Sequence, residues 1–247
     1  MRLYKLLTFV IVAILFASCN FTENIYINED GSGKMSFDVD ASAIMDMAGD
    51  SMKNEKGLDS TFAFKTFFEA KKDSIAKLPQ ADQERLKKME NFSVNMKMKP
   101  EEKKFVFSIF TDFKNTSELV DMMQAMKTIE DMKGKKKEQD PSNPFSNTFQ
   151  NNTDLKFVYN GKTFSRKVKV KDVALQKTIS DSLVSMKGML AAFNYNIKYH
   201  FPKKVKSVSN KNALFSEDRK TITIEYPFTD YLEKPESLSF DVVLEKK

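Results

Sequence analysis

Three predicted β-hairpins, each followed by a predicted amphipathic helix, restrict the fold of this 247-residue chain more than any other feature. In the first hairpin, Met35, Phe37 and Val39 alternate with polar residues after a turn at 29–33. A period of two is typical of a strand with one buried face. The turn places Gly31 and Gly33 where a hairpin loop needs residues that tolerate a positive φ.

The second and third hairpins lie at about 92–109 and 155–170. In the third, Asn160 and Gly161 separate two strand-like runs, which is the strongest short hairpin signal. Helical spacing follows the three hairpins at about 42–53, 117–129 and 171–192, and further helices are predicted at about 66–77 and 82–90. The remainder, from Phe193 to the end, alternates like a meander of strands.

These elements predict an α+β fold, in which an antiparallel sheet is built from hairpin–helix units and the helices pack on one face of it. Low identity between the three units favours a general way of covering a sheet over duplication. The segment 133–154 has clustered lysines, two prolines and no periodicity, so it predicts a disordered loop. We therefore expect a single α+β domain over 19–247.

The first residues have the layout of a secretory signal peptide. Arg2 and Lys5 precede an apolar run at 6–17, and the small residue Ser18 stands before Cys19. A basic start, a short apolar core and a small-residue cleavage site define such signals. The run is too short for a membrane span, which needs roughly 20 apolar residues. The sequence thus predicts that residues 1–18 are a cleaved signal.

The residues Leu15-Phe16-Ala17-Ser18-Cys19 resemble the lipobox of bacterial lipoproteins, with Phe16 where leucine is usual. The resemblance implies that lipid is attached to the sulfur of Cys19 and that cleavage occurs before it. The alternative is an ordinary signal with a cysteine there by chance. The opening of the chain as a whole resembles uncharacterised lipobox-bearing lipoproteins of Bacteroidota, and this resemblance implies no activity and no site residue besides Cys19.

The expected location is the cell envelope, with the protein held by membrane lipid. Asn20 does not match the Asp that retains lipoproteins at the inner membrane in the enterobacterial sorting rule, so the outer membrane is preferred. The first strand is expected to begin at Asn24, only five residues after Cys19. A tether this short favours docking on the membrane or on a neighbouring protein.

Catalytic residue types are scarce in this chain. His200 is its only histidine and Cys19 its only cysteine, so a zinc site or a nucleophilic triad lacks ligands or partners. His200 lies on the polar side of an alternating strand, which predicts a solvated surface histidine. With seven glycines, the chain has no phosphate-binding glycine-rich loop. We expect no catalytic residues, no metal ligands, no cofactor and no enzymatic activity.

Basic residues cluster at 133–137, 166–171 and 203–206. We interpret them as solvated strand faces and a solubilising loop, with attraction to anionic lipid headgroups as the alternative. The second cluster includes Arg166 and Lys167. Export argues against nucleic acid as a partner.

The function expected from these features is non-catalytic binding or scaffolding of another envelope protein. The alternative is a carrier of lipid or another hydrophobic ligand in a methionine-lined cleft. Methionines concentrate on the predicted helix faces at Met45, Met52, Met122, Met123, Met126, Met186 and Met189. Methionine fills irregular cores and also lines adaptable binding surfaces, and we favour the core here. Three triplets that start with Asp-Ser, at 59–61, 73–75 and 181–183, resemble the O-glycosylation sequon of Bacteroidota, although Asp and Ser also cap helices.

Overall fold

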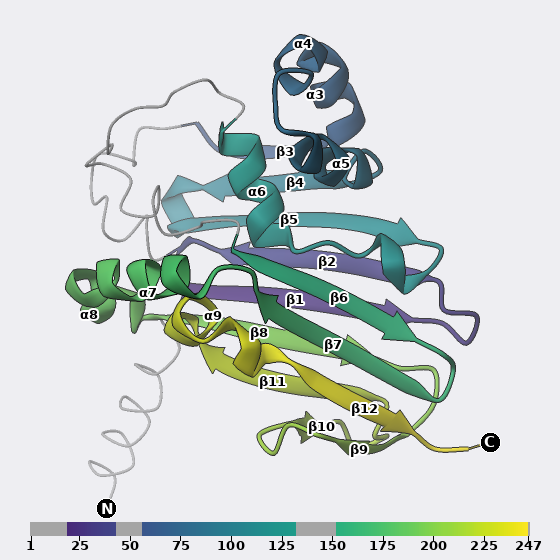
Figure 1. Cartoon of the computed structure of the whole chain (residues 1–247). Helices are drawn as coiled ribbons and strands as arrows, with labels where there is room; N and C mark the ends of the chain where they lie inside the picture. Colours follow the sequence, from purple (N-terminus) through teal and green to yellow (C-terminus); the bar gives the residue numbers. More distant parts are fainter. Residues whose placement is uncertain (1–18, 43–55, 132–151, 247) are drawn as a thin grey trace, which may run out of the picture.

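The computed structural model describes residues 19–42, 56–131 and 152–246 (Figure 1). The predicted signal peptide, nearly all of the first predicted helix and most of the predicted loop 133–154 lie outside the described residues. Within them, the chain combines helices with two open sheets in which antiparallel pairing predominates. The mixed α and β content that the sequence predicts is therefore observed.

The larger sheet, called sheet A here, has eight strands in the order β10-β11-β8-β1-β2-β5-β4-β3. Its strands are β1 (Cys19–Ile27), β2 (Gly33–Asp40), β3 (Leu58–Ala63), β4 (Ser93–Lys99), β5 (Lys104–Phe113), β8 (Phe193–His200), β10 (Leu214–Phe215) and β11 (Thr221–Pro227). The first two predicted hairpins are confirmed, because β1 pairs with β2 and β4 with β5, both antiparallel.

Two features of β1 differ from the prediction. The strand begins at Cys19 rather than at Asn24, because Phe21 and Glu23 continue the inward alternation of Ile25. It also pairs in parallel with β8, so the sheet is not wholly antiparallel. Parallel neighbours need a long crossover connection, and the chain between these two strands supplies it with most of the remaining elements.

The smaller sheet, sheet B, has the order β6-β7-β12-β9. Its strands are β6 (Thr153–Tyr159), β7 (Thr163–Val170), β9 (Val205–Val208) and β12 (Phe240–Leu244). The third hairpin is thus confirmed as β6–β7, but it lies in a separate sheet in front of β1, β2 and β8 (Figure 1). Tyr199 of sheet A contacts Phe164 and Phe240 of sheet B, with ring centroids 5.3 and 5.7 Å apart.

The expectation of a single sheet is therefore wrong. The strands β7 and β12 have an apolar face of their own, with Phe164 and Phe240 fully buried, and this face is covered by packing on sheet A. The disordered loop was predicted to extend to residue 154, and this boundary is also wrong, because Asn152 is buried and Asp154 belongs to β6.

The bounds of the helices differ from the prediction. They are α3 (Phe64–Ala70), α4 (Lys72–Ile75), α5 (Gln80–Lys88), α6 (Met122–Asp131), α7 (Val173–Ser182), α8 (Lys187–Leu190) and α9 (Phe228–Glu233), with short 3-10 turns η2 (Pro100–Glu102), η3 (Thr116–Glu118), η4 (Val184–Met186) and η5 (Pro235–Leu238). The helix expected over 171–192 is divided into α7, η4 and α8. The helix expected from 117 begins at Met122, where the Asp121 carboxylate accepts hydrogen bonds from the backbone N–H groups of Met123 and Gln124.

The two glycines of the first turn are required for different reasons. Gly31 has φ +86°, the left-handed conformation expected for a hairpin loop. Gly33 needs no positive φ, but a Cβ there would lie 1.9 Å from the carbonyl oxygen of Tyr26. Gly33 is therefore required by the close approach of two strands. In the part of the chain that the structure describes, no helix is both long and apolar enough to cross a membrane.

Candidate functional site

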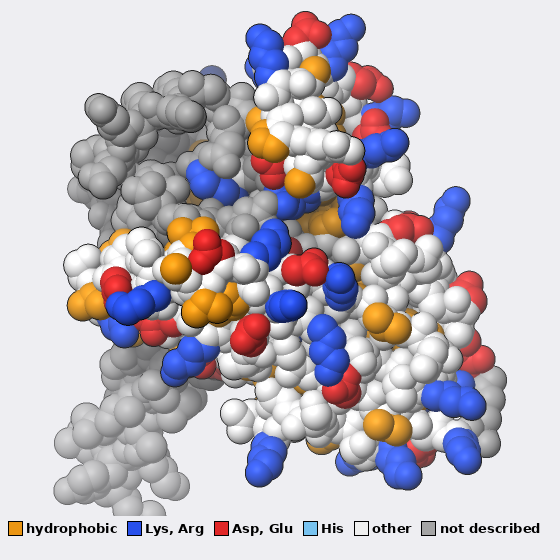
Figure 2. Space-filling model, viewed as in Figure 1, with side chains coloured by type: hydrophobic (Ala, Val, Ile, Leu, Met, Phe, Trp, Pro, Cys, Tyr) orange, Lys and Arg blue, Asp and Glu red, His pale blue; other side chains and the backbone are white. Residues whose placement is uncertain are grey.

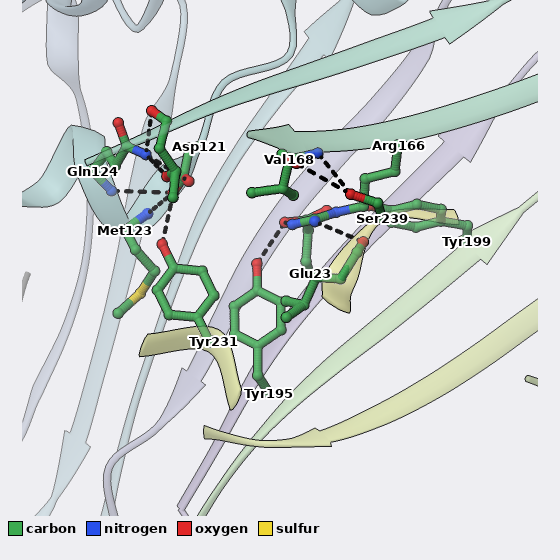
Figure 3. A network of polar contacts seen from close by, with 12 residues as sticks. Glu23, Asp121, Met123, Gln124, Arg166, Val168, Tyr195, Tyr199, Tyr231 and Ser239 are labelled. Carbon is green, nitrogen blue, oxygen red and sulfur yellow. Dashed lines mark hydrogen bonds and ion pairs between the residues drawn. The ribbon is translucent and has the colours of Figure 1, made fainter. Parts of the chain in front are cut away.

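An ion pair between Glu23 and Arg166 lies buried between the two sheets. Each side chain is only 1% exposed, and the guanidinium Nη2 is 3.5 Å from the carboxylate Oε2 (Figure 3). Glu23 stands in β1 in phase with Ile25, and Arg166 stands in β7 in phase with Phe164. Strand alternation thus directs both charges into the core, where an isolated charge is costly.

Three further groups satisfy this pair. Tyr195 donates a 2.6 Å hydrogen bond to Glu23, and Tyr199 donates another to the same carboxylate. Arg166 donates to the Tyr199 hydroxyl at 3.2 Å and to the Leu238 carbonyl at 3.1 Å. A buried pair is tolerated when its hydrogen-bonding capacity is used in this way.

Burial and the neighbouring charges keep Arg166, Tyr195 and Tyr199 in one protonation state. Burial, followed by the Glu23 charge, holds the pKa values of Tyr195 and Tyr199 well above their usual range. Burial lowers the pKa of Arg166, but Glu23, Tyr199 and Tyr195 together outweigh it and the pKa lies well above its ordinary value. The tyrosines therefore remain hydrogen-bond donors, and the network serves to join the sheets.

A second polar cluster lies beside the first. The Tyr231 hydroxyl donates to Asp121 at 3.1 Å, and Gln124 donates to Asp121 and to the Thr153 carbonyl at 3.1 Å each. The Tyr231 ring stacks on Tyr195 with centroids 4.9 Å apart, which joins the two clusters (Figure 3). Asp121 as a residue is partly accessible, but loss of water around its carboxyl group raises its pKa.

The opposite side of sheet A carries a separate group of polar side chains, which we call the polar face. Alternation and strand register place short amide, hydroxyl and carboxylate side chains together there: Asn20, Thr22, Asn24, Ser36, Asp38, Asp40, Asn95, Ser108, Asn194 and Asn196. At its centre, the Asp38 carboxylate accepts hydrogen bonds from Asn24 at 2.7 Å, from Ser36 at 3.0 Å and from Ser108.

A groove of about 360 Å³, the polar groove, is hollowed into this face. Its lining residues come from β1, β2, β4 and β5: Asn20, Thr22, Asp38, Val39, Asp40, Asn95, Val106, Phe107 and Ser108. Asn20, Thr22, Asn95 and Ser108 carry short side chains that both donate and accept hydrogen bonds, and the carboxylates of Asp38 and Asp40 accept them. The polar groove is therefore suited to hold a polar ligand surface, and Asp38 is fixed in advance by its three donors.

A larger groove of about 710 Å³ lies among α3, α4 and α5 and has no methionine in its lining. Met122 and Met123 are buried in the core, which agrees with the core interpretation. Met126 and Met186 are partly buried and pack against the core. Met45, Met52 and the side chain of Met189 lie outside the described residues.

His200 and Arg166 differ from their predicted environments. His200 lies on the polar side of β8 as expected, but its ring stacks on Tyr26 with centroids 3.8 Å apart and its Nδ1 is 2.9 Å from the Thr221 hydroxyl. Burial, followed by Lys198, lowers its pKa. Arg166 was expected on a solvated strand face, which is wrong. Its phase with Phe164 was the signal that could have placed it inside.

Cys19 is the first residue of β1, and its backbone lies opposite Phe193 of β8. The polar groove contains its neighbour Asn20, so the structure brings the predicted lipidation residue close to this groove. Across the described ranges, no group of three or more His, Cys, Asp or Glu side chains is arranged to hold a metal ion.

Comparisons with known proteins add one distant likeness. The sequence matches no protein-family model and no curated protein. Among solved structures, the folded domain of LppM from Mycobacterium tuberculosis, determined by NMR, aligns over 93% of this chain and 91% of that domain, with 8% identity and a TM-score of 0.34. A likeness at this level establishes neither a shared fold nor a function.

Proposed function

We propose that this chain is a cell-envelope lipoprotein, anchored through Cys19 and preferably at the outer membrane, that binds another envelope protein through the polar face. The observation that carries the proposal is the position of β1. The strand begins at Cys19, and its next outward residues, Asn20 and Thr22, line the polar groove. Anchor and binding surface therefore belong to the same strand.

The chemistry of the polar groove supports binding rather than catalysis. Asp38 accepts hydrogen bonds from three donors within the sheet, so its carboxylate orders the neighbouring side chains of the groove. Asn95 is held by the Thr61 hydroxyl at 2.9 Å. Short, mutually ordered side chains on a sheet face suit the polar surface of a protein partner, because little conformational entropy is lost when they bind.

The carrier alternative has less support. The described methionines that were candidates for a cleft pack into or against the core, and the groove among α3–α5 lacks methionine. A rigid core methionine such as Met122 does not offer the adaptable surface that a hydrophobic ligand needs.

The anchor is tested by expressing the full chain with Cys19→Ala in a native-type host. We expect this variant to leave the membrane fraction and to lose the label from a radioactive fatty acid. The matched control is Ser32→Ala, in the exposed turn at the far end of the β1–β2 hairpin, which should keep both. Equal membrane retention of Cys19→Ala would show that the anchor lies elsewhere.

The binding surface is tested by placing a photo-cross-linking amino acid at Asn95 in the living host. We expect a discrete protein adduct whose yield falls when Asp38→Ala is added, because the groove loses its ordering carboxylate. The control position is Lys177 on the exposed surface of α7. An adduct of the same size and yield from Lys177, or none from Asn95, would contradict the proposal.

A further inference from the structure

The end of sheet A at which β1 begins carries a second element beside the predicted anchor. Cys19 lies opposite Phe193 in the parallel ladder, and neighbouring strands are only about 4.8 Å apart. The residues that lead into Phe193 are η4 and α8, followed by Ala191 and Ala192. We call 184–192 the α8 segment, and its C-terminal end adjoins the backbone of Cys19.

One side of the α8 segment is packed into the core, and the other side exposes mainly apolar groups to the surface. Leu183, just before it, and Leu190 are fully buried and hold it to the core. Val184 is 65% exposed, and Ala191 and Ala192 are exposed as well. Figure 2 shows hydrophobic side chains at the surface over α7 and α8.

The one charge in the α8 segment is balanced. The Lys187 ammonium lies 3.0 Å from the Glu233 carboxylate on α9. The described outward surface of the segment therefore consists mainly of small apolar groups, with the hydroxyl of Ser185 and one neutralised ion pair beside them. Such a surface is compatible with the boundary between lipid headgroups and acyl chains.

We propose that the α8 segment docks on the bilayer, an inference that rests on the proposed lipidation of Cys19. Acyl chains on the cysteine sulfur bring the backbone of Cys19 to the membrane surface, and strand pairing brings Phe193 with it. Two acyl chains already give stable anchoring. The α8 segment therefore determines orientation rather than affinity.

This docking gives the molecule a defined orientation. The strands of sheet A rise from the membrane, and the turn at Asn28–Ser32 points away from it. The nine residues of β1 place this turn about 30 Å from the bilayer surface. The polar groove, which contains Asn20 and Thr22, opens close to the membrane and faces along it.

The chain has no tryptophan, so a single introduced tryptophan reports on one position. We would place it at Val184, with Ser32→Trp as the control at the far end of the hairpin. The full-length protein is purified from envelopes and reconstituted in phosphatidylcholine vesicles with brominated acyl chains. We expect V184W to lose most of its fluorescence relative to unbrominated vesicles and S32W to lose none. A191W repeats the test, should V184W disturb folding.

Mass spectrometry of the same samples separates the two proposals. If Cys19 is lipidated but the fluorescence of V184W and A191W is quenched no more than that of S32W, the docking is overturned and the lipid anchor is retained. Blue-shifted emission that brominated lipid does not quench would mean that a protein covers the segment, which also overturns it. A Cys19 without lipid would overturn both proposals.

Discussion

Glu23 and Asn24 are neighbours in β1, yet their side chains enter two different polar networks. Glu23 points between the sheets, where the charge of Arg166 neutralises it and two tyrosine hydroxyls donate hydrogen bonds to it. Asn24 points to the polar face, where it donates to the Asp38 carboxylate. A buried charge requires a counter-charge, whereas Asp38, which is partly exposed, is ordered by neutral donors alone.

The two networks also differ in how far they reach along the chain. The inner one joins Glu23 to Arg166 and Tyr199, and so links sheet A to sheet B. The outer one connects only β1, β2 and β5, which are already paired by backbone hydrogen bonds. The inner network should therefore control stability, and the outer one should be replaceable at small cost. This difference leaves the polar face available for binding.

The strongest test of this comparison removes one member of the ion pair. Arg166→Met should lower the free energy of unfolding by about 3–5 kcal/mol, because Glu23 would remain buried without its counter-charge. Adding Glu23→Leu should recover part of the loss, although Tyr195 and Tyr199 would lose their acceptor. Urea unfolding measures both variants. A loss below about 1 kcal/mol for Arg166→Met would contradict a structural role for the pair.

The second prediction concerns the pH dependence of stability that Asp121, beside the inner network, contributes. The pKa of Asp121 is raised in the folded protein. Between the unfolded and the folded pKa, the folded state therefore holds a proton that the unfolded chain has released. Its contribution to stability is present below the unfolded pKa and is lost as pH rises through the folded pKa. Asp121→Asn should remove this decline.

The measurement is the free energy of unfolding from about pH 4 to about pH 7 for wild type and variant. The control is Asp241→Asn, because a hydrogen bond from Lys167 lowers the pKa of Asp241 and its contribution is present above the unfolded pKa. That variant should lose stability at neutral pH. Identical slopes for wild type and Asp121→Asn would disprove the assignment.

The third prediction concerns the polar face. Asp38→Ala should cost about 1 kcal/mol, because the donors Asn24, Ser36 and Ser108 can turn to water in place of the carboxylate. The same urea titration applies, with unchanged far-UV circular dichroism as the check on folding. A cost equal to that of Arg166→Met would erase the distinction between the two networks.

The smallest effect is expected for a pair that belongs to neither network. Lys177 and Asp181 form an exposed i,i+4 ion pair on α7, 2.7 Å apart. Lys177→Ala should change the free energy of unfolding by no more than about 0.5 kcal/mol. A larger change would indicate that α7 has a partner surface near Lys177, and it would remove that position as a cross-linking control.

The hairpins were predictable because their signals are local. Alternation such as Met35, Phe37 and Val39, and the Asn160-Gly161 turn, depend only on neighbouring residues. The division into two sheets was not predictable in this way, because it depends on β8 pairing with β1 and β12 pairing with β7 across long stretches of chain. Short elements such as α9 also carry too few residues for a periodic signal.

The buried pair lay between these extremes. Arg166 lay inside a predicted strand and shares the phase of Phe164, whereas Glu23, in phase with Ile25, lay just before the strand predicted to begin at Asn24. Grouping Arg166 with its lysine neighbours by charge concealed that phase. The polar groove could be predicted only in part, because alternation gives the outward residues of each strand but register decides which of them meet.

The position of β1 also has a mechanical consequence. β2 and β8 hold this strand on both sides along nearly its whole length. A pull on Cys19 acts along the strand, whereas the hydrogen bonds of both ladders run across it. The two ladders are then loaded in shear and must yield together instead of opening one pair at a time. Force that reaches the protein through its proposed anchor is thus shared by the middle of the larger sheet, in the direction in which that sheet resists it best.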